Sequence, residues 1–138
     1  MPALVELCSR DCLEFLRRHD VGRVALVTPG GPRVVPVNYA VRGADVFFRT
    51  TPFSELGTYA RHSEVAFEVD EIHEGSHAGI SVVAYGFAEP IEDYDERREV
   101  QLHSDPKPWA NGRRTLYFKV HIREVTGRRV GAFAAPGC

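Results

Sequence analysis

The sequence lacks the features that mark a membrane, secreted or nucleic-acid-binding protein. No apolar run reaches the about 18 residues that a membrane-spanning helix needs, and residues 1–6 have neither the basic nor the apolar region of a signal peptide. The 17 Lys and Arg residues against 19 Asp and Glu residues give a net charge of -2, so no global positive field attracts nucleic-acid phosphates. We therefore expect a cytoplasmic protein in which any anion site is local.

Cysteine is also scarce. The 3 cysteines cannot all pair with one another, and Cys8 and Cys12 have a spacing typical of one buried helix face. Cys138 is the last residue, whereas prenylation needs a cysteine four positions from the end. A chain of 138 residues can bury enough core to fold without a disulfide or a metal. We therefore expect reduced thiols.

Six short segments show the pattern of β-strands: residues 24–27, 34–41, 46–50, 65–69, 80–88 and 116–123. Pro36 lies inside the second segment, and because proline cannot donate to a strand ladder, it predicts an edge or a bulge there. In the last segment apolar and polar residues alternate, which predicts that Tyr117 and Lys119 face water. The polar residues 70–78 are predicted to form a loop.

Three helices are predicted between or before these strands. The first begins at Ser9 as its N-cap, and a short second helix runs from Ser54 to about Arg61. Asp93 opens a charged third helix with the D-x-x-E form of a capping box, ending at about His103. Short strands with tight turns favour a mainly β protein, an antiparallel barrel with two or three helices packed outside.

Residues 73–77 spell H-E-x-x-H, the zinc-binding motif of metalloproteases. The glycine and serine between the two histidines are poor helix formers, and the segment lies in a predicted loop. No third ligand is evident either. We interpret the motif as a solvated loop and predict no metal site. No G-x-S-x-G motif occurs, and no catalytic nucleophile can be named.

A better candidate for ligand binding follows the third predicted strand. Arg49, Thr50 and Thr51 at the strand end precede Ser54 at a helix start. A guanidinium, hydroxyls and helix-terminal N–H groups together could hold one phosphomonoester. The preceding strand, with Pro36, would present unpaired backbone to a flat heterocycle alongside. The alternative is an exposed arginine beside an ordinary N-cap.

Trp109 is the only tryptophan, and it follows Pro108 in a proline-rich segment. A single tryptophan is often a core residue. In a loop stiffened by proline it also suits an aromatic wall for a ligand or a partner subunit. The sequence leaves both interpretations open.

At these residues the sequence resembles the pyridoxamine 5'-phosphate oxidase-like family of flavin-binding split barrels. The resemblance runs over nearly the whole chain, through residues 22–25, 36–39, 46–50, 65–70, 81–83 with Gly86, 108–110 and 126–129. It implies a single FMN-binding domain over residues 1–138. The implied fold is mainly β, a six-stranded antiparallel split β-barrel with two to three peripheral α-helices.

The resemblance also implies a homodimer with two FMN molecules in the grooves between its chains. Residues of the second predicted strand would contact the isoalloxazine ring, and residues after the third would hold the phosphate. Two further residues would approach from the other subunit. The cofactor-binding residues implied in this way are Pro36, Val37, Asn38, Arg49, Thr50, Thr51, Ser54 and Leu56, with Ser81 and Trp109 from the partner. The chemistry implied is hydride or electron transfer through flavin N5, without a side-chain nucleophile.

Two positions depart from the family pattern. Relatives usually carry a lysine that pairs with the phosphate where this chain has Glu55, and often a tryptophan where it has Ile80. The leading hypothesis is an FMN-binding oxidoreductase of unknown substrate. The alternatives are a non-catalytic flavin- or haem-binding protein, a deazaflavin-dependent reductase on the same fold, and a metal or redox sensor using the cysteines with His73 and His77.

Overall fold

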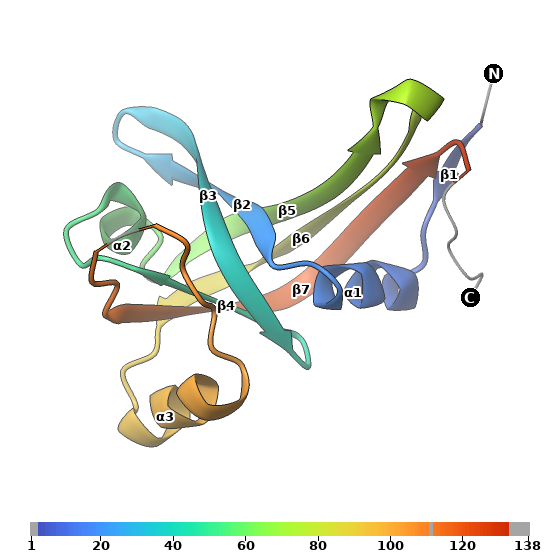
Figure 1. The fold of residues 1–138 in the computed structure, drawn as a ribbon. Helices are drawn as coiled ribbons and strands as arrows, with labels where there is room; N and C mark the ends of the chain where they lie inside the picture. Colours follow the sequence, from blue (N-terminus) through green and yellow to red (C-terminus); the bar gives the residue numbers. More distant parts are fainter. Residues whose placement is uncertain (1–2, 111, 133–138) are drawn as a thin grey trace.

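The structure is a computed structural model that describes residues 3–110 and 112–132. Its strands and helices follow one another along the chain as shown in Figure 1. They are β1 (Leu4–Glu6), α1 (Ser9–Arg17), β2 (Val21–Thr28), β3 (Gly31–Arg42), β4 (Asp45–Thr50), α2 (Glu55–Tyr59), β5 (Ser63–His73), β6 (Ala78–Pro90), α3 (Tyr94–His103) and β7 (Leu116–Val130).

Strands β2 to β7 close into an antiparallel barrel. The sheet order is β1-β7-β4-β3-β2-β5-β6, and β6 pairs back with β7, which completes the ring. β1 adds to β7 outside this ring, with Leu4 opposite Val130. The predicted six-stranded antiparallel split barrel with peripheral helices is confirmed. β1 was not predicted, because three exposed residues carry no alternating pattern.

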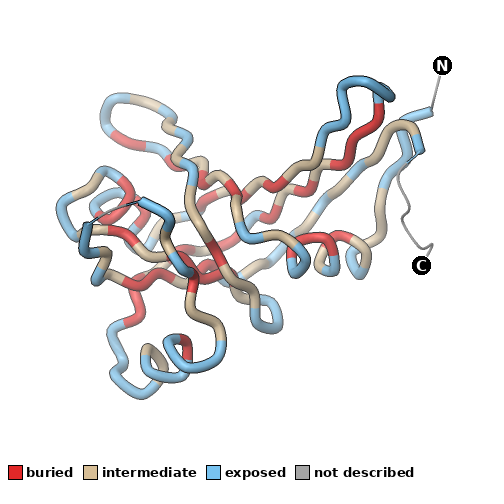
Figure 2. The backbone as a smooth tube through the Cα atoms, viewed as in Figure 1, coloured by how far each residue is buried: buried red, intermediate tan, exposed pale blue. Residues whose placement is uncertain are grey.

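The core lies inside the barrel and is built mainly from inward-facing residues of strands β2 to β7. Figure 2 shows buried positions alternating along the strands, as expected where one face of a sheet is covered. Phe48 of β4 and Phe118 of β7 are fully buried, and their rings stack with centroids 5.2 Å apart. Fully burying such a side chain stabilises the fold by about 1.5–3 kcal/mol.

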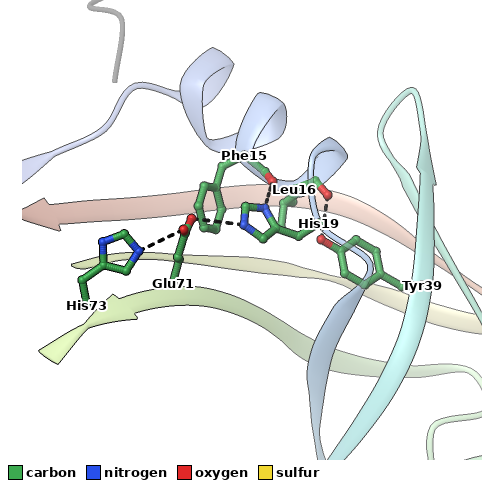
Figure 3. Close-up of polar contacts among 6 residues, drawn as sticks. All are labelled: Phe15, Leu16, His19, Tyr39, Glu71 and His73. Atoms are coloured by element: carbon green, nitrogen blue, oxygen red, sulfur yellow. Dashed lines mark hydrogen bonds and ion pairs between the residues drawn. The ribbon is translucent and has the colours of Figure 1, made fainter. Parts of the chain in front are cut away.

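α1 packs against the barrel through Cys12, Phe15 and Leu16, which are almost completely buried. The Tyr39 hydroxyl of β3 donates a hydrogen bond of 2.6 Å to the carbonyl of Leu16 (Figure 3). Burial raises the pKa of Tyr39, so this hydroxyl keeps its proton. The bond fixes the end of α1 relative to β3.

A second contact joins α1 to β5 through His19, just after the helix (Figure 3). His19 Nδ1 lies 2.8 Å from the carbonyl of Phe15, and its Nε2 lies 3.4 Å from Oε2 of Glu71. The other oxygen of Glu71 lies 3.2 Å from Nε2 of His73. The polar end of β5 is therefore tied to the helix, although its residues look like a loop in the sequence.

Three sequence predictions about local structure are wrong. Cys8, not Ser9, occupies the N-cap of α1, and no side chain caps that helix. Cys8 is also disulfide-bonded, so reduced thiols are found at the buried Cys12 but not at Cys8. The predicted loop 70–78 is mostly strand, with only a 3-10 turn at Glu74–Ser76 between β5 and β6.

The prediction that Tyr117 of the last strand faces water is also wrong. Tyr117 is buried in a second small cluster with Phe47, Ile91 and Val100. Val100 belongs to α3, which therefore covers the outer face of the barrel here. α3 itself starts as predicted, with Asp93 Oδ2 accepting a 2.8 Å hydrogen bond from the N–H of Glu96. Within the described residues, no helix is long and apolar enough to cross a membrane.

Candidate functional site

A groove of about 270 Å³ lies between the free edge of β3, the end of β4, the start of α2 and the segment before β7. Figure 1 shows this last segment passing beside α2. The groove brings together most of the residues that the sequence nominated for a cofactor. Its lining consists of Val35, Pro36, Val37, Asn38, Arg49, Thr50, Thr51, Ser54, Glu55, Leu56, Pro108, Ala110 and Arg114.

The edge of β3 is free because β4 pairs with only part of it. β3 pairs with β2 from Gly31 to Asn38, whereas its pairing with β4 covers only Tyr39 to Arg42. Pro36 lies in the stretch without a β4 partner, so its missing N–H costs no ladder bond there. The predicted edge at Pro36 is confirmed, and it forms one wall of the groove.

The turn after β4 is held by its own hydroxyls. Ser54 Oγ donates to the carbonyl of Thr51 at 2.8 Å and accepts the N–H of Gly57 at 2.9 Å, so Ser54 is the N-cap of α2 as predicted. Thr50 Oγ1 lies 2.8 Å from Ser54 Oγ and must be the donor, because the Ser54 proton is already used. Thr50 and Ser54 therefore shape the groove wall.

Arg49 reaches from β4 toward the segment before β7. Its Nε donates to the carbonyl of Arg114 at 3.0 Å, and its Nη1 lies 3.6 Å from Oδ2 of Asp105. Its guanidinium also lies 4.9 Å from the centre of the Tyr117 ring, within the range of a cation–π contact. Burial and the hydrogen bond to Asp105 raise the pKa of Tyr117, although Arg49 opposes this. The predicted phosphate-binding arginine therefore holds protein groups as well.

Glu55 lines the groove at the position where relatives carry lysine. Its Oε2 lies 3.4 Å from Nε of Arg33 at the tip of the β2–β3 hairpin. Both side chains are more than two-fifths exposed, so solvent weakens the pair. The negative charge of Glu55 is nevertheless partly offset by a cation next to it.

Trp109 and Ser81 lie outside the lining. The backbone N–H of Trp109 donates to Oδ1 of Asn38 at 2.9 Å, which holds the loop against β3, while Trp109 as a whole is 73% exposed. The core interpretation of Trp109 is therefore wrong. Ser81 lines a second cavity of about 460 Å³ on the outer face of the barrel, together with Tyr85 and Arg128.

Sequence reasoning missed four lining residues: Val35, Pro108, Ala110 and Arg114. Val35 is next to Pro36 and Pro108 is next to Trp109 in the chain. Adjacency to these two candidate residues could therefore have suggested both as lining residues. Arg114 had none, because it lies in an irregular segment far along the chain from the other groove residues. Only the fold brings it beside Arg49.

The H-E-x-x-H segment does not fold as the helix that carries this motif in metalloproteases. His73 ends β5, residues Glu74–Ser76 form the 3-10 turn, and His77 has a left-handed backbone with φ of 51°. Across residues 3–110 and 112–132, no group of three or more His, Cys, Asp or Glu side chains is placed to hold a metal ion. The segment is therefore the end of β5 followed by a short turn that leads into β6.

Comparison with known proteins now adds to this geometry. The family model described as pyridoxamine 5'-phosphate oxidase matches residues 9–129, from the start of α1 almost to the end of β7. The chain belongs to this family. An uncharacterized protein of Mycobacterium tuberculosis is 29% identical to this chain, over 94% of this chain and 87% of its own length.

Solved structures share the fold of this chain. A conserved protein of unknown function from Corynebacterium diphtheriae is 31% identical, with a TM-score of 0.75, over 92% of this chain and 98% of its own. A FAD-binding protein from Mesorhizobium loti is 23% identical, with a TM-score of 0.78, over 96% of this chain and 100% of its own. The latter similarity shows the shared fold.

Proposed function

We propose that this protein binds FMN in the groove and acts as a flavin-dependent oxidoreductase, with a substrate that is still to be found. The observation that carries the proposal is the convergence of two separate segments on one groove. Residues 36–38 of β3 and residues 49–56 around the β4–α2 turn line the same space. A family of flavin-binding split barrels and a FAD-binding protein of the same fold support the choice of flavin.

The groove suits a flavin because its walls differ in chemistry. Val35, Val37 and Leu56 supply apolar surface, which suits a flat aromatic ring system. Arg49 and Arg114 supply positive charge, which suits a phosphate. When bound, a flavin supplies hydride or electron transfer, while the protein positions it and tunes its surroundings.

We further propose that the working unit is a homodimer in the cytoplasm. The groove of one chain, at about 270 Å³, is smaller than the about 300–1,000 Å³ typical of ligand sites. A second copy would enlarge it and cover the open side. The exposed indole of Trp109 and the outer-face Ser81 are the residues proposed to meet the flavin bound to the partner.

The visible absorption spectrum of the purified full chain, with and without added FMN, tests the proposal. We expect flavin bands that follow the protein through gel filtration and bleach when a nicotinamide donor is added. As a matched pair, Thr51→Val changes a residue of the groove lining, and Thr115→Val changes an exposed residue outside the described lining. Thr51→Val should weaken FMN binding, whereas Thr115→Val should not.

Other outcomes would point to other functions. A Soret band would favour haem, and binding of a deazaflavin coenzyme instead of FMN would favour a deazaflavin-dependent reductase. Bound flavin that no donor reduces would favour a non-catalytic binding protein. A colourless protein that does not bind added FMN would contradict the proposal.

A further inference from the structure

The second cavity, on the outer face of the barrel, has the size of a ligand site. Its volume is about 460 Å³, within the about 300–1,000 Å³ typical of small-molecule sites. Residues of β6 and β7 form most of its lining, together with Glu6 of β1 and Leu7. None of its lining residues belongs to the groove proposed for flavin. The second cavity can therefore hold a ligand of its own.

Three polar side chains of this cavity lie in one row across the sheet. β7 pairs with both β1 and β6, so that Arg128 is opposite Glu6 on one side and opposite Ser81 on the other. Residues directly opposite one another in an antiparallel pair share a face of the sheet. Thr126, two positions before Arg128, shares that face because side chains alternate along a strand. A guanidinium and two hydroxyls therefore gather in the cavity, with a carboxylate beside them.

Arg128 differs from most arginines of the barrel strands. Within residues 3–110 and 112–132, its side chain forms neither a hydrogen bond nor an ion pair, and Glu6 lies beyond ion-pair distance from it. Arginines that do have a carboxylate partner are Arg23, Arg33, Arg42, Arg49 and Arg123. A guanidinium is suited to bidentate binding of an oxyanion. Arg128 therefore presents such a group to the second cavity.

The rest of the lining favours an aromatic ligand with a single negative charge. Tyr85 is 39% exposed and lines the cavity with Val83 and Val125, so a ring can pack against it. The exposed Glu6 carboxylate repels anions, and it repels a dianion such as a phosphate monoester more strongly than a monoanion. A small aromatic carboxylate matches both features.

We propose that the second cavity binds a small aromatic carboxylate, that Arg128 holds its carboxylate group, and that this is the substrate class of the flavin site. The substrate role rests on the proposed function and deepens it. Ser81, which lines the same cavity, is the residue proposed to meet the flavin bound to the partner. A ligand in this cavity would therefore lie beside that flavin.

Calorimetric titration of the full chain without flavin tests the binding site. Benzoate should bind at least tenfold more tightly than benzamide, its neutral counterpart, because hydrogen bonds to charged groups are typically worth about that much. R128Q should bring the two affinities within about twofold of each other, by the same reasoning. R129Q is the matched control, since Arg129 lies outside the described lining and side chains of neighbouring strand residues point to opposite faces.

A change at Glu6 should act in the opposite direction. E6Q removes the repelling charge, so it should raise the affinity for benzoate about two- to fivefold, the size of an exposed charge–charge contribution. Its affinity for benzamide should not change. A purely structural disturbance of the cavity would not raise one affinity and lower the other. Unchanged affinity for benzamide in E6Q and R128Q shows that each variant has folded.

The substrate role is tested with the FMN-loaded protein. Benzoate should shift the absorption bands of the bound flavin, because an anion beside the ring system changes its electrostatic surroundings, and R128Q should abolish the shift. Bound benzoate without a shift would overturn the substrate role.

Equal affinity of the unmodified protein for benzoate and benzamide, or an equal loss in R129Q, would overturn the whole inference while leaving the proposed function intact. Failure of the unmodified protein to bind FMN would instead overturn the proposed function and the substrate role with it. The titrations without flavin would still decide whether Arg128 binds a carboxylate.

Discussion

Glu68 of β5 lies on the outer face of the barrel, where two carboxylates share one cation. Arg23 Nη1 lies 3.4 Å from Oε1 of Glu68 and 3.9 Å from Oδ2 of Asp70. Burial, followed by the hydrogen bond and the charge of Asp70, raises the pKa of Glu68 from 4.5 to about 7, and Arg23 offsets only part of this. The folded state therefore favours the protonated form of Glu68.

This raised pKa predicts a pH-dependent stability. Between about pH 4.5 and pH 7 the folded chain binds more protons at Glu68 than the unfolded chain, so this group's contribution to stability falls as pH rises. Glu68→Gln should therefore raise the free energy of unfolding above about pH 7 and change it little below about pH 5. Urea unfolding at both pH values measures the difference.

Glu64→Gln is the control for this prediction, because Glu64 lies on the same strand but pairs with Arg123 in a more exposed position. It should show no comparable gain at high pH. If Glu68→Gln were equally stabilising at low and high pH, the raised pKa would not be the cause.

At the scale of elements, the turn between β4 and α2 depends on a glycine. A Cβ at Gly57 would lie 2.3 Å from the backbone oxygen of Thr51 and 3.2 Å from Oγ of Ser54. Gly57→Ala should therefore open the turn and cost about 1–3 kcal/mol of stability, as overpacking typically does. Because Thr51 also lines the groove, FMN affinity should fall as well. Thermal unfolding and FMN titration measure the two effects.

Gly75→Ala is the matched control, because nothing lies within 4 Å of the position that its Cβ would take. It should leave both the stability and the flavin affinity nearly unchanged. A Gly57→Ala protein that bound FMN as tightly as the original would show that the turn does not shape the binding site.

The elements themselves were largely predictable from hydrophobic periodicity, and the structure shows where that signal ends. The β5–β6 hairpin continues to His73 opposite Ala78, four residues beyond the apolar alternation that ends at Val69. Backbone pairing extends a strand whatever its side chains, so polar ends of long hairpins look like loops in the sequence. The cap of α3 was recognised because a capping box is a local pattern.

At the scale of the whole molecule, we propose that each flavin site is shared between two chains. Ser81 lies outside the groove of its own chain, so a disruptive change there should affect only the groove of a partner. We expect Ser81→Glu alone to lower FMN binding. We expect the unmodified protein to sediment with the mass of two chains.

Mixing two defective chains tests this arrangement directly. A Ser81→Glu chain and a Thr51→Val chain, unfolded together and refolded in equal amounts, should form mixed dimers with one intact site each. Random pairing would restore about a quarter of the sites, which FMN titration can measure. A monomeric protein, or mixtures that restore no binding, would contradict a site built from two chains.

The sequence by itself determined the strands, the free edge at Pro36 and the cap at Ser54, because each depends on residues near one another in the chain. The barrel and most of the groove lining were expected from the resemblance to a known family. Only the tertiary structure decided that Arg49 holds the backbone of Arg114, that Arg33 faces Glu55, and that α3 buries Tyr117. These contacts join segments far apart in the sequence. Local spacing carries no information about them, because they form only where the closed barrel brings distant strand ends together.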